Sequence, residues 1–85
     1  MDKPQMTSFE HASGGQFRLA VRGTSVQYAL DEAGERQRIE WLEEYLAINK
    51  VCPAGYQVTD RTVVNRGSVI GIQHHEVVYR GACRN

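Results

Sequence analysis

The stretch that decides the fold runs from Cys52 to Cys83, CPAGYQVTDRTVVNRGSVIGIQHHEVVYRGAC, with two runs rich in β-branched residues on either side of a Gly-Ser pair. A two-residue type II′ turn needs glycine at its first central position, where φ is positive, and Gly67-Ser68 supplies it. With the chain folded back at this turn, Cys52 on one arm faces Cys83 on the other. The sequence therefore predicts one long β-hairpin closed at its base by a Cys52–Cys83 disulfide.

The register of this hairpin places an apolar face near the disulfide and a polar face near the turn. The facing pairs include Tyr56 with Tyr79, Val58 with Val77 and Asp60 with His75. At about 3.3 Å per residue each arm would extend roughly 50 Å, which is long for a domain of this size. We therefore expect a strong twist, a bulge near His74-His75 or a protruding tip.

A disulfide would matter for the stability of so short a chain. Eighty-five residues form one domain, which buries roughly 60% of its unfolded surface. A bridge that closes about 32 residues contributes roughly 3 to 4 kcal/mol in the chain-entropy model. Paired cysteines favour an oxidising compartment, whereas two unrelated buried thiols are the alternative.

Composition limits the partners and the location. Residues 1–8, MDKPQMTS, contain no apolar run, as expected of a mature exported domain with an added starting Met or of a cytosolic protein. Nothing approaches the roughly 18 apolar residues of a membrane span. Ten acidic and ten basic side chains cancel, which argues against duplex nucleic acid as a partner. Residues 31–50 carry six acids against three bases, and residues 51–85 carry two acids against four bases, which predicts an acidic helix face and a mildly basic sheet.

The N-terminal half divides into an arm, a strand and an ambiguous segment. Residues 1–15 mix Pro, Ser, Gly and charged residues without periodicity, which predicts a flexible arm before a single domain over residues 16–85. Alternating apolar residues from Gln16 to Arg22 predict a half-buried strand. A second alternation over residues 26–30 predicts another strand, although residues 25–34 also fit a helix that breaks near Gly34.

An amphipathic helix follows. Asp31 is an N-cap candidate, the helix begins between Asp31 and Glu35, and it ends before Pro53. Trp41 and Tyr45 lie on its apolar face, which predicts that they belong to the core. Roughly 24 Å of helix would cover the disulfide half of the hairpin and leave the tip uncovered. We predict an α+β fold, ββαββ with βαββ as the alternative, in which one helix packs on a mostly antiparallel sheet.

No motif in the sequence predicts catalysis, a metal site or a cofactor. His74 and His75 are adjacent in a strand and point to opposite faces, so they cannot share a metal without a bulge. Asp60 facing His75 resembles an acid and base pair, but no nucleophile accompanies it at a recognisable spacing. C-x-x-C and phosphate-loop motifs are absent. We therefore predict a non-enzymatic protein, and its candidate partner contacts are Arg61, Arg66, Ser68, His74 and His75.

The segments WLEEYLAINKVCPAGYQVTDRTVV (residues 41–64) and VVYRGAC (residues 77–83) resemble the mature globular part of small bacterial envelope lipoproteins. The resemblance covers roughly residues 39–84. It implies an export signal and a lipidated cysteine upstream, attachment to a periplasmic membrane face through the arm, and a structural or accessory role without catalytic residues. No lipobox is present in this sequence.

Three functions follow as hypotheses. The first is a non-catalytic periplasmic or cell-envelope accessory domain, on the periplasmic face of the outer membrane, that binds a protein or an envelope component. The second is a small secreted or periplasmic inhibitor, or an immunity-type protein, that uses the hairpin tip around Gly67 by insertion or strand addition. The third is a cytosolic nucleic-acid-binding module with Tyr56 and Tyr79 as stacking residues, but both tyrosines fall on the helix-covered face.

Overall fold

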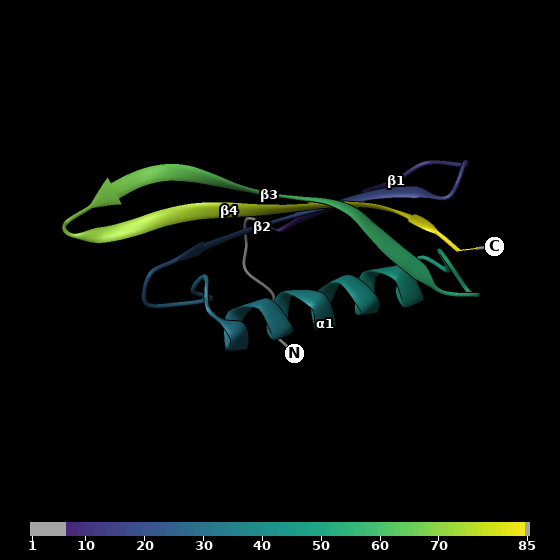
Figure 1. Cartoon of the computed structure of the whole chain (residues 1–85), viewed down its shortest axis with the longest axis horizontal. Coiled ribbons are helices and arrows are strands. Elements are labelled where there is room, and N and C mark those ends of the chain that lie inside the picture. The colour runs from purple at the N-terminus through teal and green to yellow at the C-terminus, as the bar shows by residue number, and fades with distance from the viewer. Residues whose placement is uncertain (1–6, 85) are drawn as a thin grey trace.

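A four-stranded antiparallel sheet with one helix on one face forms the protein (Figure 1). The structure is a computed structural model, and it describes residues 7–84. The elements in chain order are β1 (Ser8–His11), β2 (Gln16–Thr24), α1 (Glu32–Ile48), β3 (Tyr56–Val69) and β4 (Ile72–Cys83). The strand order in the sheet is β1-β2-β4-β3. The predicted ββαββ α+β fold is therefore confirmed.

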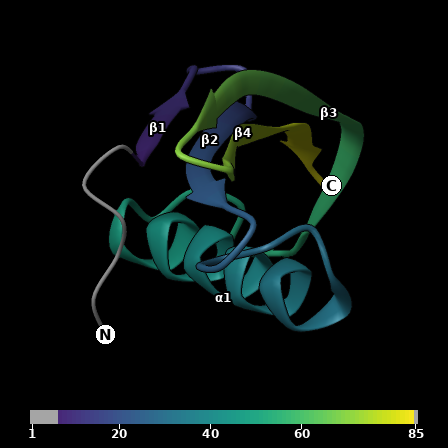
Figure 2. The ribbon, with the colours of Figure 1, turned by 90° about the vertical axis from the view of Figure 1, so that its left-hand side faces the viewer.

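The core lies between α1 and the two central strands. Phe17, Leu19 and Val21 alternate along β2 and are all buried, which confirms the predicted strand. Their partners come from β4 and from the apolar face of the helix: Val77, Tyr79, Trp41, Leu42 and Leu46. In the view of Figure 2 the sheet curls above the helix, with β2 and β4 between its two edge strands.

The helix starts and stops where its sequence predicts. Asp31 is the N-cap, and its Oδ1 accepts a hydrogen bond of 2.8 Å from the backbone N–H of Gly34. At the other end the side-chain amide of Asn49 donates to the Tyr45 carbonyl at 2.8 Å. Lys50 follows with a positive φ of 56°, so the chain turns away from the helix before Pro53.

Two predictions for the N-terminal half are wrong in the described residues. Ser8–His11, assigned to the flexible arm, form β1 and pair with β2, and the Phe9 ring stacks on Tyr45 with centroids 5.2 Å apart. The rest of the predicted arm before residue 7 lies outside the described residues. Residues 26–30 form neither a strand nor a helix but a loop, because only Tyr28 of the alternating set packs on the core, against Trp41.

The hairpin is present, but its turn and register differ from the prediction. The turn is Ile70-Gly71, so that Val69 faces Ile72, and Gly67 instead belongs to a bulge. Both glycines have positive φ, which is why the sequence alone did not distinguish the turn from the bulge. The predicted pairs of Tyr56, Val58 and Asp60 are wrong. The observed pairs are Tyr56 with Cys83, Val58 with Gly81, Asp60 with Arg80 and Asn65 with His75.

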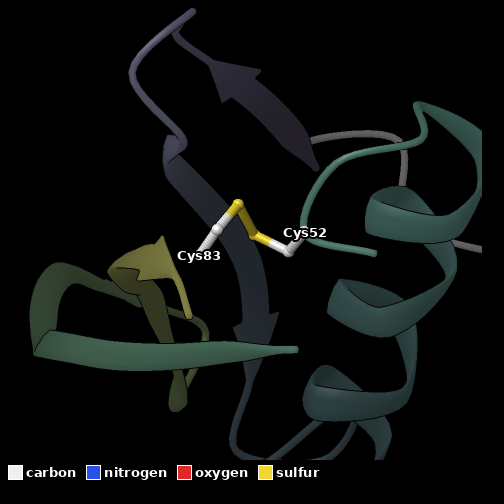
Figure 3. The surroundings of a disulfide bond; sticks show 2 residues. All are labelled: Cys52 and Cys83. Carbon is white, nitrogen blue, oxygen red and sulfur yellow. A yellow bond between two sulfur atoms is a disulfide. The ribbon is translucent and has the colours of Figure 1, made fainter. Parts of the chain in front are cut away.

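The Cys52–Cys83 disulfide is confirmed, although Cys52 lies outside the strand ladder. The two Cα atoms are 4.7 Å apart, and the S–S bond is 2.07 Å long. Figure 3 shows the bond joining the loop after α1 to the end of β4. The disulfide therefore ties the exit of the helix to the central sheet. It lies at the end of the molecule opposite the hairpin tip, which projects beyond the helix in Figure 1.

Candidate interaction surface at the hairpin tip

The tip of the β3-β4 hairpin is an exposed apolar projection. Ile70 is 95% exposed, and its neighbours Val69 and Ile72 are also exposed. Ile70 and Gly71 have φ values of 52° and 77°, the signature of a two-residue type I′ turn. Such turns favour Gly, Asn or Asp at both positions. Most other residues cost roughly 1 to 2 kcal/mol in this left-handed region, because their Cβ comes too close to the following carbonyl oxygen. A β-branched residue at positive φ is a clear outlier.

A bulge sets the direction of the tip. Arg66 and Gly67 together lie opposite the single residue His74, and Gly67 has a φ of 91°. The Asn65 side-chain Oδ1 accepts a hydrogen bond of 2.9 Å from the Gly67 N–H, which holds the bulge in place. A bulge bends its strand and increases the local twist. The expected bulge near His74 is therefore present, and its extra residue lies on β3, opposite His74 of β4.

A groove of about 510 Å³ lies at the base of the tip, between the loop before α1 and the hairpin. Its apolar lining includes Ala29, Leu30 and Val63, and His74 lies on its wall. Ser25 bridges the loop to the hairpin, because its N–H donates to the Gln73 carbonyl at 3.0 Å. The tip, the groove and this bridge lie at the same end of the molecule.

The five predicted contact residues separate into two groups. Arg66, Ser68 and His74 lie in the tip region, on or beside the bulge. Arg61 is directed toward the helix, where its guanidinium binds Glu35 with N···O distances of 2.8 and 3.1 Å. His75 is buried, and its Nε2 lies 3.1 Å from the Tyr28 carbonyl oxygen, so this nitrogen carries the donated proton. Arg61 and His75 thus belong to the support of the fold.

Arg38 is a structurally important residue that was not predicted from the sequence. It is 1% exposed, and its Nε donates to the Tyr79 hydroxyl at 3.0 Å. Its Nη1 donates to the carbonyl oxygens of Tyr28 and Ala29 at 3.0 and 3.1 Å. Arg38 therefore fixes the loop that lines one side of the groove. A signal was available, because Arg38 precedes Trp41 by three residues and so lies on the buried stripe of the helix.

Glu35 links the two arginines electrostatically. Burial alone would raise the pKa of Glu35, but hydrogen bonds from Arg61, Tyr79 and Arg38 outweigh it and lower the pKa below its usual value. In turn, the hydrogen bond with Glu35 raises the pKa of Arg61. Burial raises the pKa of Tyr79, which keeps its hydroxyl protonated in this cluster. The cluster is a supporting ion-pair network behind the groove.

The predicted facing pair of Asp60 and His75 does not form. Asp60 faces Arg80, whose Nη1 lies 3.4 Å from the Asp60 Oδ2, and His75 faces Asn65 instead. Within residues 7–84, no group of three His, Cys, Asp or Glu side chains is placed to hold a metal ion. The same residues include no helix with the length and apolar character needed to cross a bilayer.

No family model matches this chain, and searches of curated proteins and of solved structures found no match either.

Proposed function

We propose that the protein is a non-catalytic accessory domain of the periplasm or cell envelope that binds another protein through the hairpin tip. The observation that carries the proposal is Ile70, an apolar β-branched residue that is 95% exposed at a positive φ. In the free protein the Ile70 side chain does not pack in the core, and its positive φ is unfavourable for a β-branched residue. Burial in a partner would supply the missing benefit.

The energetics support insertion of the tip into an apolar pocket. Burying an isoleucine side chain contributes roughly 1.5 to 3 kcal/mol, and a few buried apolar residues carry most of the binding energy in many interfaces. The tip is also held in one conformation by the Asn65-Gly67 hydrogen bond and by the Ser25-Gln73 bridge. A preorganised projection loses little entropy on binding.

The chemistry of the tip defines the partner surface that it fits. Residues 65–75 contain one charged residue that is always ionised, Arg66, and no acidic residue. A complementary surface is an apolar pocket with an acidic rim, because such a rim would attract Arg66 while the pocket receives Ile70.

The disulfide and the lipoprotein resemblance support the proposed compartment. A bond between Cys52 and Cys83 persists most readily in an oxidising environment such as the periplasm. The projecting tip also favours a second candidate, a small secreted or periplasmic inhibitor or immunity-type protein whose tip fills the cleft of its target.

Site-specific photo-crosslinking in the cells that make the protein tests the proposal. A photoreactive residue at position 70 should capture a defined partner, which is then identified by mass spectrometry and purified. Binding of that partner to the Ile70→Asp variant should be at least roughly tenfold weaker, since an aspartate would be desolvated in an apolar pocket. A matched probe at Ile48, which is 70% exposed on the helix, should not capture the same protein.

Two results would overturn the proposal. One is the same set of adducts from positions 70 and 48, which would show non-specific contact. The other is unchanged affinity of the purified partner for Ile70→Asp. If the captured protein is an enzyme that the wild-type domain inhibits and the variant does not, the inhibitor hypothesis replaces the accessory-domain hypothesis.

A further inference from the structure

The sheet has an open edge that the hairpin tip does not use. Among residues 7–84, β3 is an outermost strand of the sheet, and β4 is its one strand partner. It is 14 residues long, and nearly all of its side chains are exposed. An edge strand presents unpaired backbone N–H and C=O groups, which form a template for another strand.

A regular six-residue segment lies within this edge. Bulges interrupt the pairing of β3 with β4 between Val58 and Asp60 and again between Asn65 and Ser68. Between them, the register from Asp60–Arg80 to Asn65–His75 has no shift. Bulges protect an edge by twisting it away from other strands. The segment from Asp60 to Asn65 is therefore the part of β3 best able to accept a new strand.

The charged side chains of this segment do not oppose pairing with another strand in the usual way. Arg61 is drawn down to Glu35 on α1, and Asp60 lies beside Arg80 of β4. Between Arg61 and the second bulge, Val63 is 42% exposed and Val64 is partly buried. Exposed charges on an edge strand normally prevent pairing, but here the nearest arginine is engaged within its own fold.

We propose that β3 pairs with β3 of a second copy, antiparallel and centred on Val63. In this register Val63 faces Val63 of the second copy, and Asp60 lies across from Arg66 of the second copy, the residue that directly follows the regular segment and begins the bulge. The twofold symmetry repeats the charged pair, so that Arg66 also faces Asp60 of the second copy. Opposite charges directly across an antiparallel pair stabilise it, and like charges destabilise it.

Symmetry and charge together select this register. Two identical antiparallel strands at the edges of two sheets are related by a twofold axis perpendicular to the joined sheet. One residue of β3 must therefore lie opposite the same residue of the second copy, and side chains opposite each other point to the same side of the sheet. Centring on Thr62 or Val64 places no opposite charges across from each other. Centring on Arg61 or Asp60 places like charges in contact. Val63 is the one centre from Asp60 to Val64 that gives two favourable charged pairs.

The assembly would be a continuous eight-stranded sheet with both helices on the same face. Val63 lines the groove at the base of the tip, so pairing at Val63 would also cover part of that groove. The regular ladder ends at Asn65, and the bulge of Arg66 and Gly67 bends the strand before Ile70. The two apolar tips would therefore extend beyond the shared ladder, and this inference does not depend on the proposed function of the tip.

Sedimentation velocity of the full chain over a concentration series tests the inference. The wild type should show a reversible monomer–dimer equilibrium. Asp60→Arg should weaken association by roughly tenfold or more, because two arginine pairs then face each other, and Arg66→Asp should do the same through two acidic pairs. An equimolar mixture of the two variants should restore dimers, since the heterodimer again pairs opposite charges.

Matched controls separate dimerisation from effects within one chain. Glu32→Arg and Arg36→Asp make the same changes of charge on an exposed ion pair of α1, away from the edge, and should leave the equilibrium unchanged. Ile70→Asp should also still dimerise. The mixing experiment is decisive because the Asp60→Arg chain still lacks its own ion pair between position 60 and Arg80. Dimers in the mixture must therefore come from the restored pairs of opposite charge between the two chains.

Three outcomes would overturn the inference. They are a wild type that is monomeric at every concentration, single reversals that dimerise as tightly as the wild type, and a mixture of folded single variants that stays monomeric. Thermal unfolding of each variant, together with its disulfide content, establishes that the chains compared are folded.

Discussion

At the residue scale, the protein depends on one buried cation. The Arg38 guanidinium binds Tyr79, two carbonyl groups and Glu35, whose Oε1 lies 3.3 Å from Nη2. A buried charge is tolerated when its hydrogen bonds are satisfied in this way. Because two of its partners are carbonyl groups of the loop before α1, Arg38 couples the helix to the wall of the groove.

We expect Arg38→Ala to lower the free energy of unfolding by about 3 kcal/mol, because it leaves buried acceptors without donors and opens a cavity. Urea denaturation measures the change. Arg36→Ala, on the exposed face of the same helix, should change stability by less than about 0.5 kcal/mol. Equal effects of the two substitutions would contradict the role assigned to Arg38.

Glu35 should make stability depend on pH. Its pKa is lowered in the folded state, so the stability that it contributes is present above the unfolded value of about 4.5 and is lost as pH falls through the lower folded value. Glu35→Gln should therefore reduce stability at neutral pH and flatten this acid limb. Denaturation midpoints measured between neutral and acidic pH test the prediction, and an unchanged acid limb would exclude Glu35 as its source.

Ile70 is strained as well as exposed, and relieving the strain should stabilise the free protein. Ile70→Asn produces an Asn-Gly pair at the turn, the sequence that type I′ turns prefer. We expect the free energy of unfolding to rise by roughly 1 kcal/mol. Ile48→Asn, equally conservative in size but on the helix, should not stabilise. A loss of stability in Ile70→Asn would show that the isoleucine serves the free fold.

At the scale of elements, the sequence predicted those parts that local chemistry specifies. The helix followed from its Asp31 cap and its apolar stripe, and β2 followed from the alternation of Phe17, Leu19 and Val21. The segment over residues 26–30 alternates equally well, yet it is a loop in which only Tyr28 of the alternating set packs on the core, and Arg38 hydrogen-bonds to the Tyr28 and Ala29 carbonyl groups. Tertiary contacts of this kind leave no local pattern.

The hairpin shows why register is harder to predict than the presence of strands. Gly67 and Gly71 both have positive φ, and a glycine can serve a turn or a bulge. The turn was predicted at Gly67-Ser68 because a type II′ turn needs glycine at its first central position, whereas the observed turn places isoleucine at positive φ, which turn propensities disfavour. The position of the turn was therefore predicted wrongly at Ile70, the residue that we propose for binding. The candidate site was accordingly predicted in part: Arg66, Ser68 and His74 lie in the tip region, whereas Ile70 was not considered.

At the scale of the whole molecule, the disulfide and the tip occupy opposite ends of a body 45 Å long. The cysteines are separated by 31 residues, and their bond ties the loop after α1 to β4. One end of the molecule is therefore covalently closed, and the other end projects beyond the helix.

Removing the disulfide should destabilise the whole fold. We expect Cys52→Ser/Cys83→Ser to lower the free energy of unfolding by roughly 3 kcal/mol, the entropic value for a loop of this length. Urea denaturation measures the loss, and hydrogen exchange should accelerate first around residues 50–56. A variant as stable as the wild type would contradict the structural role of the bond.

The decisive measurement for the role of Ile70 is calorimetry of the purified crosslinked partner with Ile70→Asn and with the wild type. We expect that the variant, although more stable on its own, binds at least roughly tenfold more weakly because the apolar anchor is lost. Ile48→Asn should bind as the wild type does. Equal affinity of Ile70→Asn and the wild type would contradict the claim that this strained, exposed isoleucine is kept for binding.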